Sequence, residues 1–117
     1  MMIDAYIGHF NSPGFDFYCG NYDGNIPKRQ SPLLPMARGI LDAMCKMMRN
    51  AEYEARQLDW GAWGAKMTKE QLSDFINSFY GNDEFDELPE VRDYIQKLDA
   101  DKVYLLVAYE TGEDYGD

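Results

Sequence analysis

The sequence predicts an α+β domain, in which a small antiparallel sheet is covered by about three helices. Three observations support this class. Residues 3–10 alternate large apolar with smaller or polar side chains, residues 34–58 repeat apolar side chains at three- and four-residue spacing, and residues 102–110 are apolar in both alternating registers. These patterns are typical of a strand, of a helix with one buried face and of an inner strand. The predicted order of elements is β-β-α-α-α-β.

Residues 3–19 predict an antiparallel hairpin. "IDAYIGHF" at residues 3–10 would form its first strand, and "FDFYC" at residues 15–19 its second. Between them, Pro13 and Gly14 suit the two central positions of a type II turn, because proline restricts the first φ and glycine accepts the positive second φ. Residues 20–31 are rich in Gly, Asn and Pro and predict a loop.

A long helix is predicted over residues 34–58, with one apolar face. The residues of that face are Ile40, Leu41, Met44, Met47, Met48, Ala51, Ala55 and Leu58. The sequence "DWGAWGAK" at residues 59–66 interrupts the pattern with two glycines and predicts a loop. Trp60 and Trp63 in this loop are expected to cap the core; an exposed pair would instead mark a contact site.

The next predicted helix has a clear N-terminal signal. Thr68 and Gln71 have the spacing of a capping box, in which each side chain binds a free backbone N–H of the first turn. Met67 and Leu72 stand where a hydrophobic staple would pack. Gly81 follows the last apolar residue, at the position where a helix commonly ends in a left-handed residue.

A third helix is expected to start near Pro89, and the last strand to occupy residues 102–110. We expect this strand to join the N-terminal hairpin, with the helices packed on one face of the sheet. Residues 1–117 are predicted to form a single domain, of which residues 110–117 would be a frayed acidic tail.

The acidic residues are concentrated near one end of the sequence. Residues 82–117 contain 12 acidic and three basic residues, a net charge of −9, whereas residues 1–81 contain nine acidic and eight basic residues, a net charge of −1. Such a chain would be repelled by nucleic acids and anionic membranes and attracted to basic surfaces. We therefore expect a basic protein partner and no direct binding to nucleic acid or membrane.

Residues suited to catalysis or metal binding are few. The sequence has one histidine, His9, and two cysteines, Cys19 and Cys45, too few for a closed four-ligand zinc site. The loop "CGNYDGN" has part of a calcium-loop pattern but lacks acidic residues at the first and last ligand positions. We predict no catalytic residues, no metal and no cofactor. The alternative is a small enzyme or ligand-binding domain with a site near His9, Tyr18 and Cys19.

The predicted partner-binding segment lies between residues 83 and 94. Its acidic residues would supply the electrostatic field and its two aromatic residues the packing. The predicted contact residues are Asp83, Glu84, Phe85, Asp86, Glu87, Glu90, Asp93 and Tyr94. Acidic residues three or four apart on a helix lie roughly 5–6 Å apart, a density comparable with the phosphates of duplex DNA. The alternative is a solvated connector whose acidic residues favour the dipole of the following helix.

These features together predict a small acidic inhibitor that blocks a basic, nucleic-acid-binding protein by charge mimicry. Anti-defence proteins of phages and plasmids, such as anti-CRISPR and anti-restriction proteins, have this physical character, as do immunity proteins that neutralise nuclease toxins. A dimeric adaptor domain is a further alternative. The N-terminus has no basic leader followed by an apolar run, so we expect a cytoplasmic protein.

Overall fold

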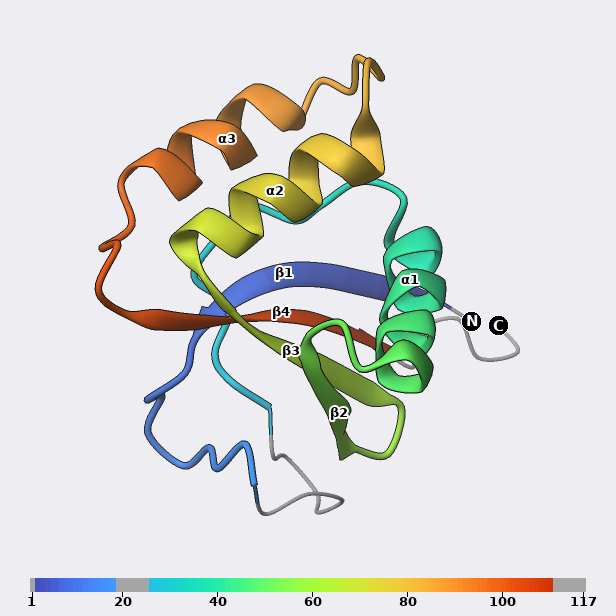
Figure 1. Cartoon of the computed structure of the whole chain (residues 1–117), viewed down its shortest axis with the longest axis vertical. Helices are drawn as coiled ribbons and strands as arrows, with labels where there is room; N and C mark the ends of the chain where they lie inside the picture. Colours follow the sequence, from blue (N-terminus) through green and yellow to red (C-terminus); the bar gives the residue numbers. More distant parts are fainter. Residues whose placement is uncertain (1, 19–25, 111–117) are drawn as a thin grey trace.

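The computed structural model describes residues 2–18 and 26–110, and within these ranges it contains one four-stranded antiparallel sheet and three helices (Figure 1). The α+β class is confirmed. The elements are β1 (Ile3–His9), α1 (Ala37–Asn50), β2 (Glu54–Asp59), β3 (Ala62–Thr68), α2 (Lys69–Tyr80), α3 (Leu88–Gln96) and β4 (Val103–Glu110). Of the predicted acidic tail, Glu110 ends β4 and residues 111–117 lie outside the described residues.

Strand β4 is the inner strand that organises the sheet, whose order is β1-β4-β3-β2. It pairs with β1 on one side and with β3 on the other. The buried apolar residues form two clusters, a larger one that we call the main core and a smaller one that we call the second core. Tyr104, Leu106 and Ala108 belong to the main core, whereas Leu105 and Val107 belong to the second core. Since successive side chains of a strand point to opposite faces, β4 needs apolar residues in both registers. The predicted inner strand, and its pairing with the first strand, are confirmed.

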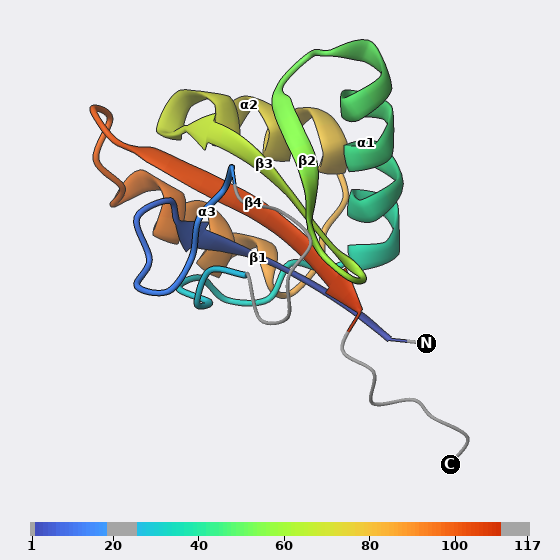
Figure 2. The same ribbon diagram turned by 90° about the horizontal axis from the view of Figure 1, so that it is seen from below.

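All three helices contribute to the main core, on one face of the sheet, as predicted. Helix α1 contacts all four strands, and α2 contacts β3, β4 and α3. Figure 2 views the molecule with the strands in front of α2 and α3. Helix α3 buries Leu88, Val91 and Ile95 and is the third helix expected from Pro89.

The prediction of a second strand in an N-terminal hairpin is wrong: residues 15–18 form no strand. The last residue of the predicted strand, Cys19, lies outside the described residues. A turn, in which the Phe15 N–H donates to the Ser12 carbonyl at 3.2 Å, folds the segment under the sheet instead. Phe17 is buried there against Tyr6 and Leu105, within the second core. An alternating pattern predicts which side chains are buried, but a folded-back loop and a paired strand both satisfy it.

The hairpin of this protein lies between α1 and α2, and the predicted helix and loop there are corrected. Helix α1 ends at Asn50, with Ala51 in the left-handed conformation at φ 56°. Residues 54–59 form β2 and residues 62–68 form β3, joined by a turn in which Gly61 has φ 71°. The helical spacing of Ala55 and Leu58 is therefore coincidental: as strand residues, Ala55 is partly buried against the main core and Leu58 is fully buried in the second core.

The capping box of α2 is confirmed. The Gln71 N–H donates to Thr68 Oγ1 at 3.2 Å, and the Thr68 N–H donates to Gln71 Oε1 at 2.9 Å. Met67 and Leu72 are both fully buried in the main core. Gly81 has the expected positive φ of 56°, although its ψ of −120° lies outside the left-handed helical region.

The outer edge of β1 is covered by the segment that leads into α1. The N–H groups of Gln30 and Ser31 donate to the Ile7 carbonyl at 3.1 and 3.2 Å, and the Leu34 N–H donates to the Ala5 carbonyl at 2.8 Å. Residues 30–34 thus bind the backbone groups of β1 with which a second N-terminal strand would have had to pair. Edge strands with unsatisfied backbone groups invite association, and here one edge is closed by the chain itself.

The capping box gives a first prediction. Replacing Thr68 with alanine removes the acceptor of the Gln71 N–H and should lower the free energy of unfolding by about 1 kcal/mol. Thr68→Ser keeps the hydroxyl and should retain most of the stability. Urea unfolding followed by circular dichroism measures both; equal stability of the alanine and serine variants would contradict the role of the cap.

Candidate partner-binding surface

The six acidic residues of the predicted binding segment lie together at one end of the molecule. Asp83, Glu84 and Asp86 belong to the connection between α2 and α3, and Glu87, Glu90 and Asp93 continue it along α3. All six side chains are exposed. We call these six residues the acidic row.

The backbone holds the connection in defined turns. The Asp83 N–H donates to the Tyr80 carbonyl at 2.9 Å, and the Leu88 N–H donates to the Phe85 carbonyl at 3.1 Å. Pro89 stands in the first turn of α3, where its missing N–H costs no helical bond. Glu87, Glu90 and Asp93 therefore follow one another at three-residue intervals on the outer side of α3, roughly 5–6 Å apart.

Few basic side chains in the described part of the chain form ion pairs with the acidic row. Asp93 forms an exposed ion pair with Lys97 at 3.0 Å, and it is the only one of the six with such a pair in residues 2–18 and 26–110. The guanidinium of Arg92 donates to Asn77 Oδ1 instead. Five of the six carboxylates thus have no ion pair within the described residues, so much of the negative potential of the row is retained.

Charge is also separated between the helices. Residues 69–102, which include α2 and α3, contain ten acidic and four basic residues, a net charge of −6. Residues 37–50 of α1 contain three basic residues and one acidic residue, a net charge of +2. Helix α1 lies at a different side of the molecule from α3 (Figure 1), so the protein is electrically polar.

An open depression of about 510 Å³ lies within the acidic row. Phe85 is half-buried there and meets the ring of Tyr80 edge-on, with the ring centroids 5.9 Å apart. The residues that line the depression are Asp83, Glu84, Phe85, Asp86, Leu88, Pro89 and Arg92. Apolar groups beside carboxylates suit the aliphatic stem and charged head of a lysine or arginine.

Tyr94 is the second aromatic residue of the predicted site, and part of its side chain packs into the core. Its side chain is half-buried and packs against the main core. Its hydroxyl is buried and, among the residues that the structure describes, has no hydrogen-bond partner. Desolvation raises the pKa of Tyr94, and nearby Tyr104 adds to this effect. Asp93 and Tyr94 are adjacent on α3, but only the carboxylate is fully presented to solvent.

The alternative site near His9 is not a single pocket in the described part of the chain. His9 is exposed at the end of β1, with its ring 5.5 Å from that of Tyr104, beside an open hollow of about 560 Å³ that also includes Asp101. Tyr18 does not line this hollow, although its ring lies 6.2 Å from that of Phe10, which does; its hydroxyl accepts a hydrogen bond from Lys66 Nζ at 3.0 Å. Cys19 lies outside the described residues.

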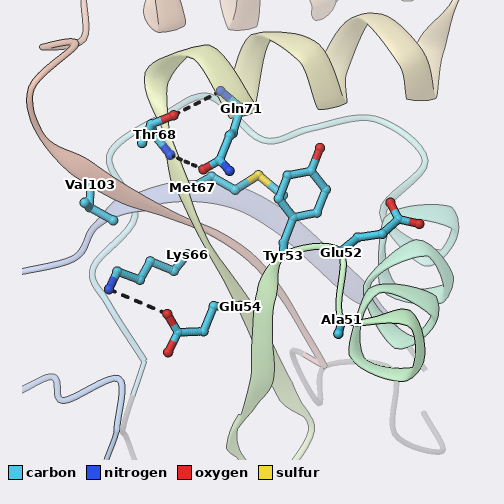
Figure 3. A pocket seen from close by; sticks show the side chains of 9 residues that line it. All are labelled: Ala51, Glu52, Tyr53, Glu54, Lys66, Met67, Thr68, Gln71 and Val103. Carbon is cyan, nitrogen blue, oxygen red and sulfur yellow. Dashed lines mark hydrogen bonds and ion pairs between the residues drawn. The ribbon is translucent and has the colours of Figure 1, made fainter.

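Another hollow, of about 480 Å³, opens where β2 begins (Figure 3). Four of its polar side chains already bind one another: Lys66 pairs with Glu54 at 3.6 Å, and Thr68 and Gln71 form the helix cap, which leaves Glu52 and Tyr53. Few groups are left to orient a small ligand, which usually needs several convergent polar contacts. Across the described ranges, no group of three or more His, Cys, Asp or Glu side chains is placed to hold a metal ion.

The two tryptophans have different environments, so the expectation that both cap the core is wrong for Trp60. Trp63 on β3 is half-buried against the main core. Trp60 is 80% exposed at the turn between β2 and β3. A sequence read as a loop gave no indication of this difference, because the hairpin decides which side chain points inward.

Comparisons with protein-family models, curated proteins and solved structures found no match to this chain. Within the described ranges, no helix combines the length and the apolar character needed to cross a membrane. The function must therefore be inferred from the charge and geometry of the surface.

Two tyrosines near the acidic row allow a matched test of their hydroxyl groups. The Tyr80 hydroxyl donates to the Pro35 carbonyl at 2.5 Å, whereas the Tyr94 hydroxyl is buried without a described partner. Tyr80→Phe should lower the free energy of unfolding by about 1 kcal/mol, because a partly buried carbonyl loses its donor. Tyr94→Phe should leave it unchanged or raise it. Urea unfolding at pH 7 compares the two, and a larger loss for Tyr94→Phe would contradict the assigned contacts.

Burial of tyrosine hydroxyls also predicts the alkaline stability. Desolvation raises the pKa of Tyr6 and, together with nearby Glu87, that of Tyr80. The unfolded chain then releases these protons first, so stability should be constant up to about pH 10 and fall above it. Thermal unfolding between pH 8 and 11 measures the slope. Tyr6→Phe/Tyr80→Phe should have a shallower slope, and an identical slope would refute this origin.

Proposed function

We propose that this protein is a small cytoplasmic inhibitor, which binds a basic protein through the acidic row and occupies a surface that otherwise binds nucleic acid. The observation that carries the proposal is the exposure of six neighbouring carboxylates, of which only Asp93 is ion-paired within the described residues. A cationic surface on a partner supplies the missing counter-charge.

The spacing of the carboxylates supports mimicry of a phosphate backbone. Glu87, Glu90 and Asp93 follow the axis of α3 at roughly 5–6 Å, and the acidic residues of the preceding connection extend the row. Duplex DNA carries one phosphate per about 3.4 Å on each strand. Lysine and arginine side chains that contact phosphates are long and flexible enough to accept carboxylates at a similar density.

The depression around Phe85 provides packing in addition to charge. A lysine or arginine of the partner would place its aliphatic stem against Phe85 and Pro89 and its charged head beside Asp83 or Asp86. Long-range attraction accelerates encounter, whereas burial of such an anchor slows dissociation. The proposed contacts therefore supply both parts of a stable complex.

A solvated connector with a favourable helix dipole accounts for part of this pattern only. Glu87 and Glu90 lie at the N-terminus of α3, where negative charge is stabilising. Asp83, Glu84 and Asp86 precede the helix and have no such role. Solubility alone also does not require the acidic residues to gather at one end while α1 carries net positive charge.

Anti-defence proteins that block a nucleic-acid-binding enzyme, and immunity proteins that neutralise a nuclease toxin, are the two classes that fit this proposal. Both act stoichiometrically and need no catalytic residues. Affinity capture from lysate of the host, at low and high salt, distinguishes a basic nucleic-acid-binding partner from other proteins. The expected partner is released by salt and displaced by added duplex DNA.

Charge reversal within the acidic row gives the mutational prediction. Asp86→Lys/Glu90→Lys should weaken partner binding at least tenfold, because two carboxylates are replaced by cations that repel the basic surface. Both residues are exposed, so the fold should be retained, with the melting temperature lowered by about a few degrees because the N-terminus of α3 loses the favourable carboxylate of Glu90. Binding of the captured partner is measured by titration calorimetry.

The matched control is Asp42→Lys/Glu52→Lys, which alters the net charge by the same amount at exposed positions outside the acidic row. It should retain most of the affinity. Equal loss for both variants would mean that only net charge matters, and wild-type affinity of the Asp86/Glu90 variant would reject the acidic row as the binding surface.

A further inference from the structure

We infer that two copies of this chain associate through the outer edge of β2, so that their sheets join across a two-fold axis. This surface lies on the hairpin β2–β3, and the inference does not depend on the acidic row. The partner is a second copy of the same chain, and its recognition would come from backbone pairing and from charges on one face of the strand.

The two edges of the sheet are treated differently. Backbone groups of Gln30, Ser31 and Leu34 cover β1, and Ser31 Oγ accepts from the Ile7 N–H at 2.8 Å. Along β2, Glu54–Gln57 pair with β3 on one side, and no described backbone group pairs with them on the other. An open edge of this kind accepts a further antiparallel strand.

The charges of β2 select one register for a second copy. A two-fold axis perpendicular to the sheet joins each face of one sheet to the same face of the other. Each residue of β2 then lies opposite a residue of the partner whose side chain points to the same face. With Ala55 on the axis, Glu54 lies opposite the partner's Arg56, and Arg56 lies opposite the partner's Glu54. An axis at Glu54 or at Arg56 would instead oppose like charges, which is destabilising.

Arg56 is the residue that most needs such a partner. Its neighbour across the hairpin is Gly64, so β3 offers it no carboxylate. Its guanidinium lies over the ring of Phe17, 5.7 Å from the centroid, and within the described residues it has no ion pair. The partner's Glu54 would complete this site.

Glu54 is the other residue of the proposed pair and would contact the partner's Arg56. It lies opposite Lys66 on β3, and the two side chains form an ion pair at 3.6 Å (Figure 3). Its side chain is nevertheless 53% exposed. In the joined sheet each Glu54 would stand between Lys66 of its own chain and the partner's Arg56, which gives alternating charges across the interface.

On the other face of the strand, the residue at the axis is small. Ala55 is the residue that meets its own copy, and its methyl group is the smallest side chain after glycine. Glu54–Asp59 is short, and a register shift between Gln57 and Asp59 ends its regular part. The joined region would therefore extend over about five residues on each strand, centred on Ala55.

The experiment uses two full-length charge variants, Glu54→Arg and Arg56→Glu, and sedimentation over a range of protein concentrations. The wild type should be a dimer. Each variant alone should be a monomer, because like charges then face each other in both pairs. An equimolar mixture of the two variants should restore a 1:1 dimer, because unlike charges meet again.

The matched controls are Asp42→Arg and Arg38→Glu, which make the same charge changes on exposed positions of α1 and should remain dimeric. Amide exchange of residues 53–57 in the wild type should slow as the protein concentration rises, and this measurement needs no variant. A monomeric wild type at all concentrations, or variants that fold but do not associate when mixed, would overturn the inference. The Asp86→Lys/Glu90→Lys variant should still dimerise, so loss of partner binding and loss of the dimer are separable.

Discussion

The burial of β4 on both faces is the constraint on which the rest of this structure depends. A strand with apolar side chains in both registers is stable only when each face of the sheet is covered. The three helices cover the face of Leu106, and the segment after β1 covers the face of Leu105 and Val107. Because this segment is needed as a cover, it is not available as a strand.

This arrangement decides which surfaces remain for partners. Helix α3 packs on α2 with one side, so its charged side must face solvent, and the acidic residues of the preceding connection lie next to it. The edge of β1 is covered by the chain, whereas along Glu54–Gln57 no backbone group of residues 2–18 or 26–110 pairs with the outer edge of β2. The acidic row and the β2 edge belong to different elements, so a basic partner and a second copy would not compete for the same residues.

Much of the candidate site could be predicted from the sequence, because exposure of a carboxylate depends mainly on its own hydration. Removing an unpaired charge from water is costly, so Asp83, Asp86 and Glu90 are exposed almost independently of the fold. The role of an aromatic residue could not be predicted in this way. Phe85 borders an open depression, whereas Tyr94 turns its hydroxyl into the protein, and the packing of α3 alone separates the two.

The sequence by itself determined the α+β class, the capped helix α2, the inner strand β4 and the acidic row. Each of these depends on local chemistry or on the pattern of apolar residues within one continuous segment. Tertiary structure decided the rest. Phe17 and Leu58 are buried as their apolar character demands, yet only pairing across the sheet decides that one belongs to a loop and the other to a hairpin. Burial is a property of a side chain, whereas strand pairing is a property of two distant segments that compete for the same edge.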